Sequence, residues 1–150
     1  MLKLSETIYS ALRTHGEETY PHECCGVLLG RSGDDVNTVE EAVRAGNTRT
    51  DSAHNRYHIA PQELVKIQRQ GRERGLDIVG FYHSHPDHPA QWSQTDFAEA
   101  HWLGCSYVIT AVATGVAQQT NSFLLTGTNE EDKSFQDETI QVEQLVTERC

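Results

Sequence analysis

The chain has 150 residues, a length that suits one domain with a sizeable core. Its 22 acidic and 12 basic side chains give a net charge of −10, which argues against nucleic-acid binding because that function needs basic patches. The acidic balance is typical of an ordinary acidic surface or of a salt-rich cytoplasm that screens charge. No apolar run approaches the roughly 20 residues that cross a bilayer, and the first residues lack the long apolar stretch of a secretory signal, so we expect a cytoplasmic protein without a membrane partner.

In chain order, the first predicted element is a helix over residues 5–15, which has apolar residues at helical spacing and is ended by Gly16. An almost continuous apolar run then predicts a central strand over 25–31. A short turn connects it to a second, antiparallel strand over 36–45. A polar, irregular segment follows, and residues 57–59 have the composition of a short strand.

Pro61 is typical of the first residue of a helix and predicts one over 61–74, which Gly75 ends. The apolar run that starts at Leu76 predicts a buried strand that continues to His85. Pro86 ends strand pairing because proline cannot donate to a ladder.

A polar loop leads to Ser93, which begins a third predicted helix over 95–103. The remaining predicted elements are strands, over residues 106–112, 121–125 and 135–146. Helices that bracket a mixed sheet predict an α/β (α+β) fold, and we expect residues 1–150 to form one domain.

Four cysteines are present, Cys24, Cys25, Cys105 and Cys150. Two of them are adjacent in an apolar strand start, which favours buried free thiols in a reducing compartment over a disulfide. The sequence contains no Cys-x-x-Cys pair, so a structural zinc of the ribbon type has little support.

His83, His85 and Asp96 are candidate metal ligands. Side chains alternate along a strand, so the two histidines point the same way, and Asp96 lies in the first turn of the next predicted helix. Three protein ligands with one open position are the arrangement of a catalytic zinc. Two other interpretations stay open: the histidines could be a half-buried strand pair, and Ser93-x-x-Asp96 is also typical of a helix capping box. Capping and catalysis are compatible, because Ser93 can cap the helix and still donate its hydroxyl hydrogen.

These residues resemble the motif of the JAMM (MPN+) zinc metallopeptidases, which is a distant Glu, then His-x-His-Pro, six residues and Ser-x-x-Asp. The segment 21–30 resembles the family's Pro-x-Glu-x-Cys-Gly-x-Leu-x-Gly strand and supplies the glutamate as Glu23. One departure is Trp92, where prokaryotic relatives often have proline before the serine. Trp92 changes no ligand, so it bears on the shape of the substrate groove.

The resemblance implies a curved mixed sheet flanked by helices, the JAMM/MPN (cytidine-deaminase-like) fold. It implies that His83, His85 and Asp96 hold Zn²⁺, that Glu23 is the catalytic base, and that Ser93 donates a hydrogen bond to the oxyanion of the tetrahedral intermediate. The reaction is then peptide or isopeptide hydrolysis without a covalent enzyme intermediate.

The chain looks most like the small stand-alone prokaryotic members. Resemblance to these members implies that the substrate is the C-terminal tail of a ubiquitin-like (β-grasp) sulfur-carrier protein. The enzyme would trim this tail after Gly-Gly or release a cysteine attached to it. The alternatives are a deubiquitinase-like, cell-wall or phage-tail protease, and a non-catalytic MPN interaction module. Modules of that kind lose ligands, whereas this sequence keeps them all.

The other candidate residues are assigned lesser roles. Asp87 is a rival ligand that lacks the helix start which would orient it, and we expect His88 to face solvent. Trp92 is predicted to line a groove and Trp102 to lie in the core. Four further histidines have no paired spacing and are expected to be structural, namely His22, His54, His58 and His101.

Overall fold

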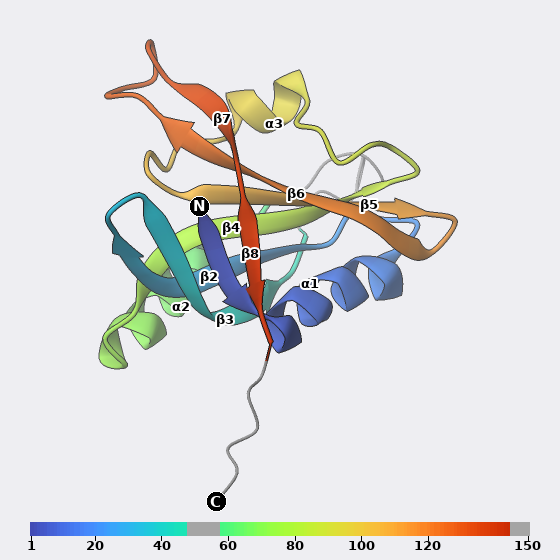
Figure 1. Ribbon diagram of the computed structural model, residues 1–150, viewed down its shortest axis with the longest axis horizontal. Helices are drawn as coiled ribbons and strands as arrows, with labels where there is room; N and C mark the ends of the chain where they lie inside the picture. The colour runs from blue at the N-terminus through green and yellow to red at the C-terminus, as the bar shows by residue number, and fades with distance from the viewer. Residues whose placement is uncertain (48–57, 145–150) are drawn as a thin grey trace, which may run out of the picture.

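The computed structural model describes residues 1–47 and 58–144 (Figure 1). Three helices and eight strands occur in the part of the chain that it describes. In chain order they are β1 (Leu2–Ser5), α1 (Glu6–Thr19), β2 (Cys25–Gly33), β3 (Val36–Ala45), α2 (Pro61–Glu73), β4 (Asp77–Pro86), α3 (Gln94–Ala98), β5 (Ser106–Ala113), β6 (Val116–Thr126), β7 (Ser134–Glu138) and β8 (Ile140–Glu143).

The strands form one mixed sheet in the order β7-β6-β5-β4-β2-β3-β1-β8. β1 runs parallel to both β3 and β8, β4 runs parallel to β5, and the other neighbours are antiparallel. The two edge strands, β7 and β8, are separated in sequence only by Thr139, and Figure 1 shows them as one nearly continuous stretch. The sheet is therefore so strongly curved that a single run of chain connects its opposite edges.

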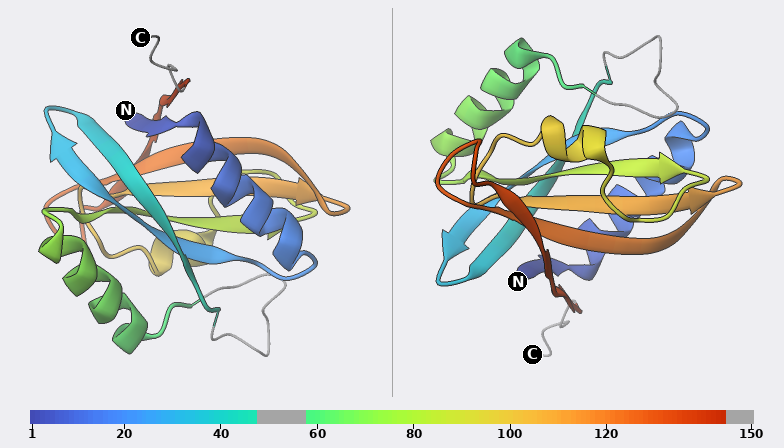
Figure 2. Two further views of the ribbon diagram at one scale, coloured as in Figure 1. Left: turned by 90° about the horizontal axis from the view of Figure 1, so that it is seen from below. Right: turned by 90° about the horizontal axis from the view of Figure 1, so that it is seen from above.

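Helices cover both faces of this sheet. α1 packs over one face, where Leu12 contacts a cluster that includes Leu28 and Tyr82. α2 and the segment around α3 lie over the other face, on a cluster that includes Val27 and Phe81 (Figure 2). The expected α/β fold with a curved mixed sheet between helices is confirmed. None of the described helices is long and apolar enough to cross a membrane.

Two boundaries near the N-terminus differ from the predictions. β1 was not predicted, because three or four residues are too few to show a period, yet Leu2 and Leu4 are buried. α1 also continues past Gly16 to Thr19. A Cβ on Gly16 would lie 3.2 Å from the Cβ of Ser84, so this glycine permits close approach to β4 and does not end the helix.

The third helix is shorter than predicted, since α3 ends at Ala98. Lys133 explains this end, because its ammonium donates to the carbonyl oxygens of Phe97 (3.0 Å) and Ala100 (2.9 Å). A cation at the C-terminal end of a helix satisfies the last carbonyl groups and complements the helix dipole. The chain then turns through Gly104, which has a positive φ of 87°, before β5 begins.

The remaining predictions differ in how closely they agree with the structure, and the predicted strand 121–125 is the end of the longer β6. α2 begins at Pro61 as predicted, and Gly75, with a positive φ of 74°, follows its end. The predicted strand 135–146 is divided into β7 and β8, and its last two residues lie outside the described residues. For the predicted strand 57–59, residue 57 also lies outside them, and residues 58 and 59 are not in a strand.

Candidate metal centre

A bulge in β4 decides which face carries the two histidines. Leu28 of β2 lies opposite Gly80, and the next residue of β2 lies opposite Ile78, so Val79 has no counterpart. Because side chains alternate with a period of two, one extra residue moves every later side chain to the other face. His83 and His85 therefore face α3, on the same side of the sheet as Ile78 and away from α1.

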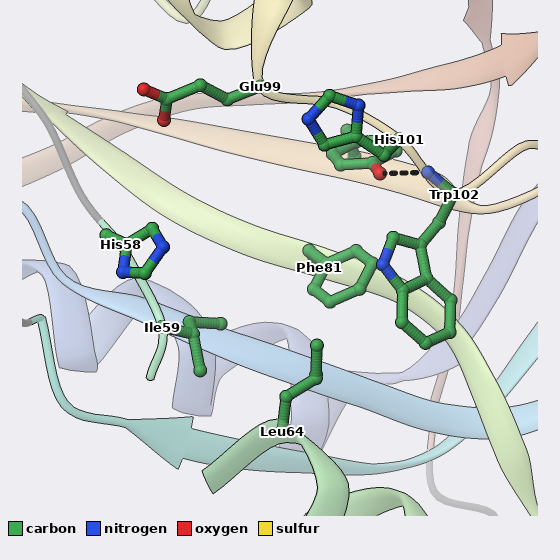
Figure 3. Close-up of a pocket in the computed structure, with 8 residues that line it drawn as sticks. His58, Ile59, Leu64, Phe81, Glu99, His101 and Trp102 are labelled. Carbon is green, nitrogen blue, oxygen red and sulfur yellow. Dashed lines mark hydrogen bonds between the residues drawn. The ribbon is translucent and has the colours of Figure 1, made fainter. Parts of the chain in front are cut away.

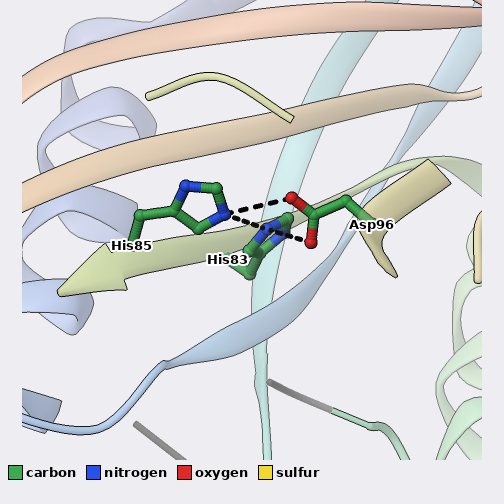
Figure 4. Close-up of side chains that lie close together, drawn as sticks. All are labelled: His83, His85 and Asp96. Atoms are coloured by element: carbon green, nitrogen blue, oxygen red, sulfur yellow. Dashed lines mark hydrogen bonds and ion pairs between the residues drawn. The ribbon is translucent and has the colours of Figure 1, made fainter. Parts of the chain in front are cut away.

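His83, His85 and Asp96 converge at this face (Figure 4). The Nε2 atoms of the histidines are 3.2 Å apart. Asp96 Oδ1 lies 3.2 Å from His83 Nε2, and Asp96 Oδ2 lies 3.1 Å from His85 Nε2. The predicted same-side orientation of the histidines is confirmed, and the start of α3 brings the carboxylate to them.

These separations fit a divalent metal ion. Tetrahedral bonds of about 2.0–2.1 Å, typical of Zn–N and Zn–O, place neighbouring ligand atoms roughly 3.3 Å apart. The three side chains offer two imidazoles and one carboxylate, all within 4.8 Å of one another by their ligand atoms. Three ligands on one side leave the opposite side for water or substrate. The geometry thus supports a divalent metal site.

The electrostatics of the three side chains are tightly linked. Burial lowers the pKa of His83. Burial also opposes the charged form of His85, but the hydrogen bond and charge of Asp96 outweigh it and raise the pKa of His85. The Asp96 carboxylate is partly desolvated, yet the histidines and the backbone of Ser93 hold its pKa well below its usual range. Asp96 is therefore an anion at neutral pH and a suitable ligand for a cation.

His85 is oriented by a backbone carbonyl from the loop that follows β4. Its Nδ1 lies 2.9 Å from the oxygen of Pro89. If Nδ1–H donates to this oxygen, Nε2 is left as the lone-pair nitrogen that faces Asp96 and the metal position. This contact cannot be predicted from the sequence, because every residue has a backbone carbonyl oxygen.

The same loop is fastened by Asp87. Its carboxylate accepts hydrogen bonds from the Tyr20 hydroxyl (2.6 Å) and from the backbone N–H of Thr114 (2.9 Å). Tyr20 lies at the end of α1 and Thr114 lies between β5 and β6, so Asp87 ties the loop to two distant segments. The structure thus gives the rival ligand a structural role, away from the three converging side chains.

Glu23 lies beside this cluster. Cys25 is opposite His83 in the β2–β4 pairing, and Glu23, two residues earlier, continues the same face. The Glu23 side chain is buried, and its Oε1 has no hydrogen-bond partner among the described residues. Burial raises the pKa of Glu23 to about 8; the charges of Asp96 and Glu99 add to the rise, and that of His85 opposes it. A buried carboxyl oxygen without a partner among the described residues is free to bond a water or a substrate atom.

Ser93 and Asp96 form the capping box that was one of the interpretations left open. The Ser93 hydroxyl accepts from the Asp96 backbone N–H (3.1 Å), and the Ser93 backbone N–H donates to Asp96 Oδ2 (2.9 Å). A hydroxyl that accepts one hydrogen bond still has its own hydrogen to donate. The cap therefore fixes the Asp96 carboxylate toward the histidines and leaves Ser93 available as a donor.

A hollow of about 370 Å³ opens between these residues and the loop after β4. We call it the Glu23 hollow; its lining includes Glu23, His85, Ser93 and Trp92. Trp92 thus lines a groove as expected, and His88 is exposed as expected, although it also contacts this hollow.

Among the described residues, the other histidines do not join the cluster. His22 and His58 are exposed, and the exposed His101 pairs with Glu130 at 2.7 Å. His54 lies outside the described residues. Trp102 is half-buried and stacks edge-on against Phe81, so its expected place in the core is only partly correct.

Comparisons with known proteins identify the family of the chain. A model of the family described as prokaryotic homologs of the JAB domain matches residues 5–125. The chain is 38% identical to the desampylase of Haloferax volcanii over 104 residues, which are 69% of this chain and 73% of that protein. It is 32% identical to a probable TtuB-protein conjugate cleaving protease of Thermus thermophilus over 90 residues, which cover 60% of this chain and 57% of that protein.

Solved structures show the same fold. A solution structure of a Desulfitobacterium hafniense protein has a TM-score of 0.80 and 25% identity, covering 97% of this chain and 95% of that one. A Salinibacter ruber protein has a TM-score of 0.71 and 38% identity, covering 93% and 90%. A JAB1/MPN domain protein of Archaeoglobus fulgidus has a TM-score of 0.54 and 15% identity, covering 95% and 96%, a likeness that concerns the fold alone.

Proposed function

The chain belongs to the family of prokaryotic homologs of the JAB domain and is a JAMM-type hydrolase. We propose that it hydrolyses the amide bond after the C-terminal tail of a ubiquitin-like protein that also serves as a sulfur carrier. The observation that carries the proposal is the convergence of His83, His85 and Asp96 beside the buried Glu23. A non-catalytic module would need none of these side chains at one place. The Haloferax and Thermus relatives, a desampylase and a probable conjugate cleaving protease, support a ubiquitin-like substrate.

We propose Zn²⁺ as the metal and His83, His85 and Asp96 as its ligands. Two imidazoles and one carboxylate are donors that zinc accepts in catalytic sites. When bound, Zn²⁺ supplies a Lewis acid that lowers the pKa of water from about 15.7 to about 7 and polarises a carbonyl. The role of the protein is to hold the three ligands on one side and to keep the His85 tautomer fixed through Pro89.

Glu23 is the proposed proton carrier. Its pKa of about 8 comes chiefly from burial, which outweighs the opposing charge of His85, and a metal cation within a few ångströms would lower the pKa of this carboxyl further. Such a group changes its protonation state near neutral pH, as a general acid–base needs. Glu23 would accept the proton of the attacking water at the oxygen that has no partner among the described residues and then give it to the leaving amine.

Ser93 is the proposed donor to the oxyanion. The capping box holds its oxygen at the start of α3, on the rim of the Glu23 hollow, and leaves its hydrogen to donate. A single fixed donor of this kind typically contributes on the order of 10²–10³ in rate.

We also infer that the chain acts as one domain in a reducing, cytosolic compartment. Cys24, Cys25 and Cys105 are buried free thiols. A ubiquitin-like conjugate is a macromolecular substrate, so the enzyme must share its compartment.

The test is direct hydrolysis of a defined substrate. Protein loaded with Zn²⁺ is incubated with a Gly-Gly-ended β-grasp protein that carries a C-terminal peptide extension, an isopeptide-linked lysine peptide or a cysteine adduct, and mass spectrometry identifies the products. We expect cleavage after the second glycine, together with about one metal ion per chain by elemental analysis. Asp96→Ala should lose both metal and cleavage. An intact set of substrates with zinc fully loaded would overturn the proposal.

A further inference from the structure

A second hollow, of about 330 Å³, lies on the same face of the sheet (Figure 3). We call it the aromatic pocket. Its apolar lining is made by Phe81, Trp102, Tyr107, Ile59 and Leu64, and the polar side chains His58, Glu99 and His101 complete it. The aromatic rings are ordered by edge-on contact of Phe81 with Trp102, by stacking of Phe81 on Tyr107, and by a hydrogen bond from the Trp102 backbone N–H to the Tyr107 hydroxyl (3.1 Å).

The aromatic pocket adjoins the candidate metal centre. Phe81 is two residues before His83 on β4, so both side chains face the same way. Glu99 follows Asp96 by three residues, and its charge acts on both Glu23 and His83. The Glu23 hollow contains His85 and Ser93, on the other side of the three ligands. The metal position therefore lies between two hollows that follow β4 and α3.

The position of Glu23 fixes the direction of a bound substrate. Glu23 has to reach the leaving amine, so the amine part lies on the side of the Glu23 hollow. The acyl part, which is the tail of the modifier, must then lie over the aromatic pocket. Extended chain advances roughly 6.6–6.8 Å over two residues, the same step that separates His83 from Phe81 on β4. Two glycines next to the cleaved bond thus bring the residue before them over Phe81.

We propose that the aromatic pocket binds one bulky apolar side chain, of leucine or phenylalanine size, that precedes the Gly-Gly of the modifier tail. This inference rests on the proposed function and adds to it a residue preference. Glycine offers no side chain for the enzyme to recognise, so the two positions next to the metal cannot distinguish one Gly-Gly tail from another. The adjoining aromatic and aliphatic walls supply the selectivity that the glycines lack. Removing such a side chain costs about 10- to 100-fold in kcat/KM, the value of burying one large apolar group.

The test uses tails that differ only at the residue before Gly-Gly, with alanine, leucine, phenylalanine or tryptophan there, attached to a β-grasp protein and followed by a reporter peptide. A Gly-Gly amide without upstream residues is the reference substrate. Leu64→Ala enlarges the pocket. The matched control is Val65→Ala, on the same helix but exposed and outside this pocket. Zinc content and the near-UV circular dichroism spectrum are measured for each variant.

The wild-type protein should prefer leucine or phenylalanine to alanine by about 10- to 100-fold, mainly through KM. Leu64→Ala should move the optimum toward tryptophan with unchanged zinc content, and Val65→Ala should keep the wild-type ranking and the wild-type activity on the Gly-Gly amide. Cleavage that ignores the upstream residue, or an unchanged ranking in a folded Leu64→Ala protein, would overturn the pocket assignment alone. Absence of cleavage of every substrate, the Gly-Gly amide included, would overturn the proposed function and the pocket with it.

Discussion

The two faces of β4 use buried polar side chains in different ways. On the α1 face, Tyr82 and the buried His15 form one closed pair, with 2.7 Å between the Tyr82 hydroxyl and His15 Nδ1, and burial lowers the pKa of His15 to about 4. On the α3 face, His83 and its neighbours converge on a shared point, and buried Glu23 keeps an oxygen without a partner among the described residues. A closed pair stabilises the fold, whereas convergent groups with unused bonding capacity indicate a ligand.

The largest expected effect is that of Glu23→Gln on the α3 face. The amide keeps the shape of the side chain but cannot carry a proton, so kcat should fall by about 10²–10⁴ while the zinc content stays unchanged. Steady-state kinetics and elemental analysis measure the two quantities. Glu18→Gln, at an exposed glutamate, is the control and should leave both alone. Turnover that survives in Glu23→Gln would show that the proton passes through another group.

Ser93→Ala should have the next largest effect. It removes the proposed oxyanion donor and a helix cap together, so kcat should fall by about 10²–10³ and the free energy of unfolding by about 1 kcal/mol. Ser5→Ala separates the two contributions, because Ser5 caps α1 by accepting from the Ile8 N–H at 3.2 Å, on the opposite face. Ser5→Ala should lose similar stability and keep kcat. Equal kcat losses in both variants would mean that Ser93 acts only as a cap.

A third effect concerns pH and stability in protein stripped of metal. The pKa of Glu23 is raised on folding, so the folded state binds a proton that the unfolded state has released, and stability must fall as pH rises toward about 8. Between pH 6.5 and 8 this loss amounts to at most about 2 kcal/mol. Glu23→Gln should flatten that slope in urea unfolding. The pKa of His15 is lowered on folding, so the unfolded state still releases protons near pH 6.5 and adds a small slope of the opposite sign, which both proteins share. Identical slopes for the two proteins would show that Glu23 is charged in the folded state.

The smallest effect is expected from Tyr82→Phe on the α1 face. Loss of the hydroxyl leaves buried His15 without that hydrogen bond, which should cost about 1–2 kcal/mol in the free energy of unfolding. kcat and zinc content should not change, because the ring still fills its place beside Gly26. A large loss of activity in a stable Tyr82→Phe protein would show that the two faces are coupled.

Much of the α3 face could be predicted from the sequence, because its signals are local. The alternation of His83 and His85 and the helix start at Ser93 need only short-range geometry, and both agree with the structure. The direction in which the histidines face could not be predicted, since the bulge at Val79 depends on the pairing of β4 with β2. The Pro89 carbonyl that orients His85 is a backbone group, so this contact could not be predicted from the sequence either.

Long-range packing accounts for the other differences. At the end of α3, the carbonyl of Phe97 and that of Ala100 just beyond the helix accept from Lys133, which is more than thirty residues away in the chain. The aromatic pocket combines Leu64 of α2 with Phe81 of β4 and Tyr107 of β5, and no sequence period relates those positions. Likewise, the burial of β1 follows from its pairing with strands that are distant in sequence.

The strand pairing that joins the two edges of the sheet has a consequence for the order of folding. Residues 2–5 form a ladder with residues 140–143, so β1 obtains this neighbour only when the last described strand has been synthesised. Closing so long a chain segment has a high entropic cost, so this pairing should form late. More local pairings, such as that of β2 with β3, cost less entropy and should form earlier. A nascent chain on the ribosome should therefore acquire its central hairpins first and protect the amides of β1 from hydrogen exchange last.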